Sequence, residues 1–151
     1  MIIEWKYKDF AQLSPFELYD LLRLRSEVFV VEQDCVFLDL DSIDLDCFHL
    51  LGYAQTKLLA YARIVPGGIL YKEASIGRVV TSPAVRKTGI GKKLMQQSID
   101  CLYDTFGNVP IRIGAQFYLK KFYESFGFTQ VNEIYLEDGI HHIYMIKNVS
   151  T

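Results

Sequence analysis

Two glycines and four cationic side chains lie together in the segment Arg86-Lys87-Thr88-Gly89-Ile90-Gly91-Lys92-Lys93. We call residues 86–93 the glycine turn. It follows a predicted strand and opens a predicted helix, whose first main-chain N–H groups have no partner within the helix. Such helix N-termini bind anions, and glycine lets a phosphate approach the main chain. The pattern favours a phosphate site with added charge from Arg86, Lys87 and Lys92, although the segment alone fits a tight turn with solvated cations equally well.

Two other phosphate-binding motifs fit the glycine turn poorly. A Walker loop requires GxxxxGK followed by Ser or Thr, but Arg86 stands at the first glycine position and Lys93 at the hydroxyl position. A Rossmann fingerprint requires GxGxxG, which this sequence lacks. Neither nucleotide-binding motif therefore accounts for the turn.

The glycine turn and the strand before it resemble the acetyl-CoA motif of the GCN5-related N-acetyltransferase (GNAT) superfamily, whose core is Arg/Gln-x-x-Gly-x-Gly/Ala. Residues 79–91 read VVTSPAVRKTGIG, with Lys87 where glycine is more usual. Residues 119–128, LKKFYESFGF, resemble the second motif of the superfamily at the expected distance downstream. The N-terminal half, with its segments 24–33, 39–49 and 60–63, is similar to the ElaA-type branch.

This resemblance covers essentially the whole chain and implies an α/β (α+β) architecture, the GNAT fold. A central mixed, mostly antiparallel twisted sheet would carry helices on both faces, and its middle strands would splay apart to admit the pantetheine arm of acetyl-CoA. The strand Val79, Val80 and Thr81 would bond pantetheine through its main chain, and Gln116 would bond the CoA arm by family position. The pyrophosphate would rest on Arg86, Lys87, Thr88, Gly89, Ile90, Gly91 and Lys92.

Aminolysis of a thioester needs a base for the amine, an N–H donor for the carbonyl and an acid for the departing thiolate. Tyr123 stands where related enzymes carry a tyrosine that protonates the CoA sulfur, and a core aromatic is the alternative reading. Members of the superfamily often place the base on the strand before the glycine turn, where residues 75–78 offer no Glu or His. Glu32 and His49 are the substitutes, with a water, or a purely structural role for His49, left open.

Three arginines, Arg25, Arg63 and Arg78, stand among apolar neighbours. We expect them to line a cleft and to bind an acidic group of the substrate, and internal pairing with acids such as Glu32 is an equal alternative. Six acidic residues occur from Glu32 to Asp46 without a Lys or Arg. We interpret this run as a solvated loop, with steering of a cationic amine as the second possibility.

The elements that must position these residues follow from apolar periodicity and from caps. Ile2–Tyr7 alternates as a strand, and a capping box from Ser14 to Glu17, with Pro15 at the first helical position, begins a helix that reaches about Phe29. Further strands are predicted at 48–53, 58–65, 74–81 and 111–115, helices at 90–106 and 118–126, and a final pair of strands around the turn 137–139.

Composition limits the function classes. With 151 residues, half of them apolar, and a net charge of −2, the sequence predicts one domain (1–151) and no nucleic-acid partner. Its three cysteines show no CxxC spacing, and Cys47 with His49 is a weak zinc pattern, so we predict neither a disulfide framework nor a metal site. We expect His141 and His142 at the surface or at a sheet edge. The sequence shows neither a signal peptide nor a membrane-spanning run, which predicts a cytoplasmic protein without a membrane partner.

These observations together predict an acetyl-CoA-dependent N-acetyltransferase. Acetyl-CoA would be the co-substrate, and a primary amine on a small molecule or peptide would attack it directly in a ternary complex. The oligomeric state, monomer or homodimer, stays open. Two alternatives remain: a non-catalytic CoA-binding or regulatory domain, because the usual base is missing, and an acyltransferase like the acyl-homoserine-lactone synthases, whose N-terminal pattern faintly resembles residues 25–29.

Overall fold

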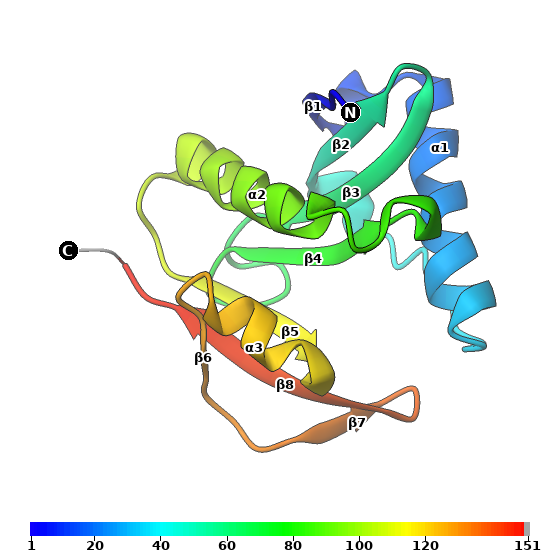
Figure 1. Cartoon of the computed structure of the whole chain (residues 1–151). Helices are drawn as coiled ribbons and strands as arrows, with labels where there is room; N and C mark the ends of the chain where they lie inside the picture. The colour runs from blue at the N-terminus through cyan, green and yellow to red at the C-terminus, as the bar shows by residue number, and fades with distance from the viewer. Residues whose placement is uncertain (150–151) are drawn as a thin grey trace.

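The computed structural model describes residues 1–149, and within them the strands form two four-stranded sheets (Figure 1). The N-terminal sheet is antiparallel, in the order β1 (Glu4–Asp9), β2 (Phe48–Ala54), β3 (Lys57–Val65) and β4 (Ser75–Thr81). The C-terminal sheet is built on β8 (Ile140–Lys147), which pairs with β5 (Ile111–Gln116), β6 (Thr129–Gln130) and β7 (Tyr135–Glu137). The predicted hairpin of β2 and β3 and the turn between β7 and β8 are confirmed, and β6 is an additional short strand.

Two helices cover opposite faces of the N-terminal sheet, α1 (Pro15–Arg25) and α2 (Ile90–Phe106). Successive residues of a strand point to opposite faces, and the core divides accordingly. Leu50 and Ala62 belong to the cluster packed under α2, whereas Leu51 and Tyr61 belong to the cluster packed under α1. The short helix α3 (Lys120–Glu124) packs against the C-terminal sheet through Tyr123, in the same cluster as α2. This arrangement is the predicted mixed α/β architecture.

The long helix α2 has the predicted bounds because one face of it is apolar at helical spacing. Its buried residues include Leu94, Met95 and Leu102, and it ends at Gly107, whose φ of 85° lies in the left-handed region that favours glycine. None of the helices in residues 1–149 is both long and apolar enough to span a membrane.

The first helix begins as predicted and then changes geometry. Ser14 Oγ accepts the Glu17 N–H, and the Glu17 carboxylate accepts the Ser14 N–H, which completes the predicted capping box. After Arg25 the helix widens into a π-helical segment, Ser26–Glu32, with i→i+5 bonds such as Gln33 N–H to Val28 O at 3.1 Å. The predicted helix to Phe29 is thus helical throughout, but its last turns have the wider π geometry.

The predicted splay of the middle strands is confirmed. The parallel strands β4 and β5 meet at their beginnings, where Ala74 bridges Ile111 and the Arg112 N–H donates to Ala74 O at 2.9 Å. Beyond this point they diverge, and no described strand pairs with the outer edge of β4. The two sheets therefore enclose a V-shaped opening that is closed at the Ala74–Ile111 end.

Candidate active site

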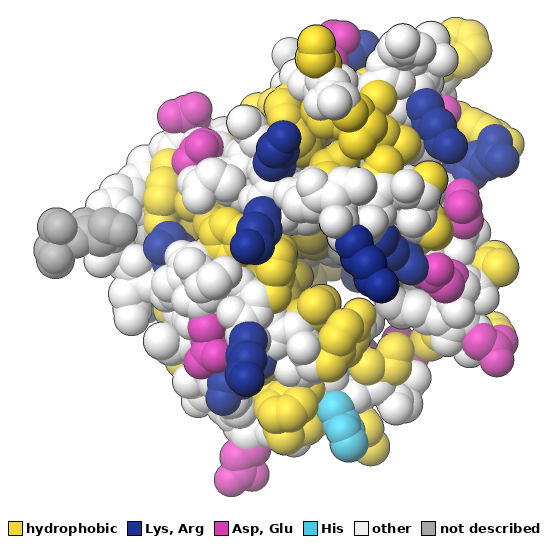
Figure 2. All heavy atoms as spheres, viewed as in Figure 1, with side chains coloured by type: hydrophobic (Ala, Val, Ile, Leu, Met, Phe, Trp, Pro, Cys, Tyr) yellow, Lys and Arg dark blue, Asp and Glu magenta, His cyan; other side chains and the backbone are white. Residues whose placement is uncertain are grey.

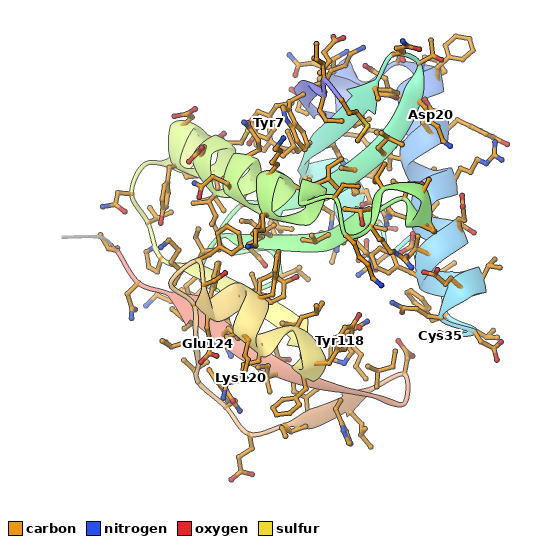
Figure 3. All side chains as sticks on the ribbon, viewed as in Figure 1. Tyr7, Asp20, Cys35, Tyr118, Lys120 and Glu124 are labelled. Carbon is orange, nitrogen blue, oxygen red and sulfur yellow. The ribbon has the colours of Figure 1, made fainter. Side chains whose placement is uncertain are left out.

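A cleft of about 580 Å³ occupies the opening between β4 and β5. Ile76 to Thr81 form one wall, and Ile113 to Gln116 form the other. Figure 2 shows apolar side chains in a hollow between the two halves of the molecule and Lys and Arg side chains gathered toward the turn before α2. In Figure 3, Tyr118 beside α3 and Cys35 after the first helix stand on opposite sides of its mouth. The cleft is thus lined by both sheets and by the helical segments beside them.

The glycine turn lies at the open end of the cleft. Gly89 precedes α2 with φ 85°, and no side chain caps the N-terminus of this helix among the described residues. The first N–H groups of α2 are therefore available to a ligand, and Gly91 lines the cleft beside them. Lys87, at the position where the motif usually has glycine, has a φ of 66°. This left-handed conformation explains the preference for glycine there, since a side chain makes it less favourable.

An ion pair joins the glycine turn to the π-helical segment across the cleft. Arg86 Nη1 donates to Glu32 Oε2 at 2.7 Å, and its second guanidinium nitrogen binds the other carboxylate oxygen. These hydrogen bonds lower the pKa of Glu32 below its ordinary value. Glu32, a candidate base in the sequence analysis, thus lies at the cleft, but the pairing makes it a weak proton acceptor.

Tyr123 also lines the cleft, from α3. Phe122 and Phe128 pack against its ring, with centroids 5.2 and 6.2 Å away. No group in residues 1–149 hydrogen-bonds its hydroxyl, and burial raises the pKa of Tyr123 to about 12. The phenol therefore stays protonated at neutral pH and can donate a hydrogen bond into the cleft. Gln116 and the strand Val79 to Thr81 line the same cleft.

The structure contradicts the expectation that Arg25 and Arg63 bind substrate. Arg25 is fully buried, with Nε 2.9 Å from Asp39 and Nη1 2.8 Å from Asp44. Arg63 is 2% exposed and pairs with Asp41 at 2.9 Å and with Asp44 at 3.0 Å. Their paired donors are thus used inside the protein, as in the alternative reading, although the acids are aspartates rather than Glu32. Arg63 Nε is buried without a hydrogen-bond partner among the described residues. We call these two arginines, Arg78 and the three aspartates the Arg–Asp network.

The third arginine connects the Arg–Asp network to the cleft wall. Arg78 Nε donates to Asp39 Oδ1 at 2.8 Å, and its guanidinium lies over the Phe37 ring. Arg78 is also among the residues that line the cleft. The β3–β4 register shifts between Tyr61 and Arg63 because β4 contains an extra residue there, and Arg78 has φ 48°. The Arg–Asp network therefore stabilises a β-bulge in the cleft wall. Its ion pairs offset the cost of the strained backbone conformation at the bulge.

The acidic run is solvated only in part, because Glu32, Asp34 and Asp46 are exposed and the other three acids are buried or half-buried. Asp39 and Asp44 are only 5% and 7% exposed, and with Asp41 they form the acidic half of the Arg–Asp network. The sequence interpretation was wrong here because the partners are 14 to 39 residues away in the chain. Only burial and tertiary contact identify them.

The Arg–Asp network predicts that the free energy of unfolding depends on pH in the acid range. Burial by itself raises the pKa of Asp44, but the hydrogen bonds and charges of Arg25 and Arg63 outweigh it and hold the pKa below the ordinary value. Burial also raises the pKa of Asp41, but Arg63 and Arg78 outweigh it and lower this pKa below the ordinary value. A carboxylate with a lowered folded-state pKa stabilises the protein above its unfolded pKa, and this stability is lost as the pH falls through the folded value. We expect the free energy of unfolding, from urea denaturation, to decrease below about pH 4.

The aspartate variant Asp44→Asn provides the control for this pH dependence. It is expected to have a lower free energy of unfolding at pH 7 and a shallower fall toward low pH than the wild type, because one titrating carboxylate is gone. Equal slopes in the two proteins would show that Asp44 contributes nothing to acid unfolding.

His49 does not face the cleft, which overturns its prediction as a base. Its side chain is fully buried, Nε2 lies 3.0 Å from Asp44 O and Nδ1 lies 2.7 Å from the Tyr61 hydroxyl. Burial lowers the pKa of His49 below its usual value, so the ring is neutral. With both ring nitrogens bonded inside the core, the histidine has a structural role.

Sequence reasoning missed two groups that line the cleft. Val28 and Phe29 come from the π-helical segment, and Gln33 is the residue that directly follows it. His142, expected at the surface or an edge, is 9% exposed and also lines the cleft. The alternation of side chains along β8 was a possible signal. The apolar residues next to His142 face α3, so His142 itself lies on the other face of the strand.

The similarities to known proteins agree with this geometry. Residues 44–149 match the family described as acetyltransferase (GNAT) domain. Protein ElaA of Escherichia coli K12 is 43% identical over 150 residues, with 98% of each chain covered. An acyl-CoA N-acyltransferase from Pseudomonas aeruginosa superposes with a TM-score of 0.93 at 40% identity, over 97% of this chain and 99% of that one. An aminoglycoside 6′-N-acetyltransferase in complex with coenzyme A shares the fold, with a TM-score of 0.70 at 17% identity over 100% of this chain and 98% of that chain.

Proposed function

The chain belongs to the acetyltransferase (GNAT) domain family and is an acyl-CoA N-acyltransferase, and on this premise we propose that it transfers an acetyl group from acetyl-CoA to a primary amine. One observation carries the proposal. A single cleft reaches from an uncapped helix N-terminus at the glycine turn to the free hydroxyl of Tyr123. It thus holds an anion site and a proton donor at once, and an acyl-CoA needs both.

The residues present fit acetyl-CoA. The N–H groups at the start of α2, with Lys87 and Lys92 exposed nearby, would bind the pyrophosphate. The outer edge of β4 from Val79 to Thr81 offers main-chain groups to the amides of pantetheine, in the manner of an added strand. Gln116 offers a side-chain amide from the opposite wall. Arg86 would exchange its bond to Glu32 for the phosphate, because both partners are anionic.

Acetyl-CoA, when bound, supplies an activated acyl group. The protein would supply the proton for the leaving sulfur and the hydrogen-bond donor for the carbonyl. Tyr123 donates its hydroxyl proton toward the leaving sulfur. A main-chain N–H group at the bulge near Arg78, in the β4 wall of the cleft, would polarise the thioester carbonyl. The amine attacks the thioester directly, so no covalent enzyme intermediate is required.

Two measurements test this function in sequence. Calorimetric titration with acetyl-CoA, with desulfo-CoA and ATP as controls, is expected to show micromolar binding that ATP does not reproduce. Thiol release from acetyl-CoA is then followed with benzylamine, spermidine and α-N-acetyl-lysine as acceptors. Absence of acetyl-CoA binding would leave only the fold in common with the family, and binding without turnover would favour a CoA-binding domain.

Replacing Gly89 by alanine is expected to weaken acetyl-CoA binding about tenfold. The added Cβ disfavours the left-handed φ of 85° that aims the first N–H groups of α2 at the cleft. Gly68→Ala is the matched control, since Gly68 also has a positive φ and open space for a Cβ but lies outside the glycine turn. Both variants should lose similar stability, and only Gly89→Ala should lose affinity. Unchanged affinity would place the pyrophosphate elsewhere.

A further inference from the structure

His142 occupies a position in the cleft that the proposed function leaves unassigned. It lies on β8 directly opposite Gln116 of β5, and both residues line the cleft. Its neighbour Ile143 belongs to the same core cluster as Tyr123 and Ala115. Because side chains alternate along a strand, the imidazole points to the other face of the sheet. The cleft thus has the phenol on one face of the C-terminal sheet and the imidazole on the other.

The contacts of the ring distinguish its two nitrogens. Nδ1 lies 2.8 Å from Ile140 O, and since a carbonyl oxygen only accepts, Nδ1 carries the hydrogen. Nε2 of the neutral ring then presents its lone pair. The Glu137 carboxylate lies 3.5 Å from Nε2, where it would pair with the imidazolium formed when the ring takes a proton. Tyr135 stacks on the ring at 5.7 Å between centroids and fixes its plane.

Several charged and titratable groups surround the ring. The titratable and charged groups that face it from the surrounding elements are Tyr135 and Glu137 of β7, Asp138 of the following turn, Tyr144 of its own strand, Arg112 of β5, and, across the cleft, Arg78 and Cys35. Arg78 is neutralised by Asp39 at 2.8 Å. Arg112 is held over the Tyr144 ring, 4.6 Å from its centroid. Glu137 and Asp138 leave this side of the cleft with negative charge.

We propose that His142 is the catalytic base that accepts the proton of the attacking amine, an inference that rests on the proposed function. The amine nitrogen forms a bond to the thioester carbonyl carbon, and its proton passes to Nε2. The carbon–sulfur bond breaks, and the sulfur leaves with the proton donated by Tyr123. The proton on His142 then returns through solvent to the Tyr123 oxygen, so that amine and thioester become amide and thiol without net change in the enzyme.

The position of Nε2 is tested by chemical labelling that needs no acceptor. Diethyl pyrocarbonate modifies unprotonated imidazole nitrogens, and peptide mass spectrometry separates the three histidines. We expect His142 to be labelled in the free protein and protected by saturating acetyl-CoA. His141 is exposed on the opposite face of β8 and should be labelled equally in both samples. Equal labelling of His142 with and without acetyl-CoA would overturn the assignment.

The role of the base is tested by kinetics on His142→Gln, with His141→Gln as the matched control. We expect kcat/KM for the best acceptor among benzylamine, spermidine and α-N-acetyl-lysine to fall about 100-fold in His142→Gln only. An imidazole base makes kcat/KM rise with pH, and this rise should be absent in His142→Gln. In a second variant, His142→Ala, added imidazole should restore turnover. Acetyl-CoA affinity should stay at the wild-type value.

The outcomes separate this inference from the proposed function. Wild-type turnover with an unaltered rate and pH profile in His142→Gln removes His142 as the base and leaves the acetyltransferase proposal standing. Acetyl-CoA binding without wild-type turnover of any acceptor in the panel contradicts the proposed function and, with it, the base.

Discussion

Replacing Arg25 by alanine is expected to lower the free energy of unfolding by about 3–5 kcal/mol. The guanidinium is fully buried and satisfies both Asp39 and Asp44. Its removal leaves Asp39 with Arg78 and Asp44 with Arg63 as their remaining ion pairs, and buried charge that is no longer fully compensated costs more than the ion pair itself contributes. The effect should extend to the cleft wall, because Asp39 also holds Arg78. Urea denaturation followed by circular dichroism measures the change.

Arg23 provides the control, because it lies on the same helix with its side chain in solvent. Arg23→Ala is expected to change the free energy of unfolding by at most about 0.5 kcal/mol. Similar destabilisation by the two variants would mean that helix propensity or net charge, rather than the Arg–Asp network, explains the loss.

Replacing Tyr123 by phenylalanine is expected to lower kcat about 100-fold or more while acetyl-CoA affinity stays nearly constant. Phenylalanine keeps the ring contacts to Phe122 and Phe128 and removes only the hydroxyl. That hydroxyl has no internal partner among the described residues, so its loss leaves no buried group unsatisfied and the fold intact. Steady-state kinetics gives kcat, and calorimetry gives the affinity.

Tyr118 is the matched control for this substitution. It lines the same cleft from the same motif region but is 74% exposed at the mouth. Tyr118→Phe should retain turnover, whereas wild-type kcat in Tyr123→Phe would remove Tyr123 as the acid. A rate loss shared by both variants would indicate a general disturbance of the cleft.

Most of the fold could be predicted because its elements carry strong local signals. The apolar stripe from Ile90 to Phe106 and the box from Ser14 to Glu17 depend on residues at most one turn apart, and such patterns can be read along the chain. The splay was predicted only through the family resemblance. The π geometry of residues 26–32 was missed because apolar spacing hardly distinguishes it from an α-helix over two turns.

The candidate site could be predicted only in part, for a physical reason. The glycine turn and Tyr123 stand in continuous motifs, and the structure places both at one cleft. The roles of Arg25, His49 and His142 depend instead on partners that are distant in the sequence and on which face of a strand is covered by other elements. In the sequence, a charged residue among apolar neighbours looks the same whether it binds a substrate or a distant aspartate. Only its burial in the structure distinguishes the two roles.

The junction at Ala74 and Ile111 also bears on how the protein moves. Strands β4 and β5 are tied at one end by a main-chain hydrogen bond of 2.9 Å and are unpaired toward the other. A seam fixed at one end acts as a hinge, so fluctuations between the sheets have their largest amplitude at Thr81 and Gln116, beside the glycine turn. A long, flexible ligand can enter and leave there by local opening, without unfolding of the shared core. We therefore expect ligand exchange to depend on the open end of this seam rather than on unfolding of the shared core.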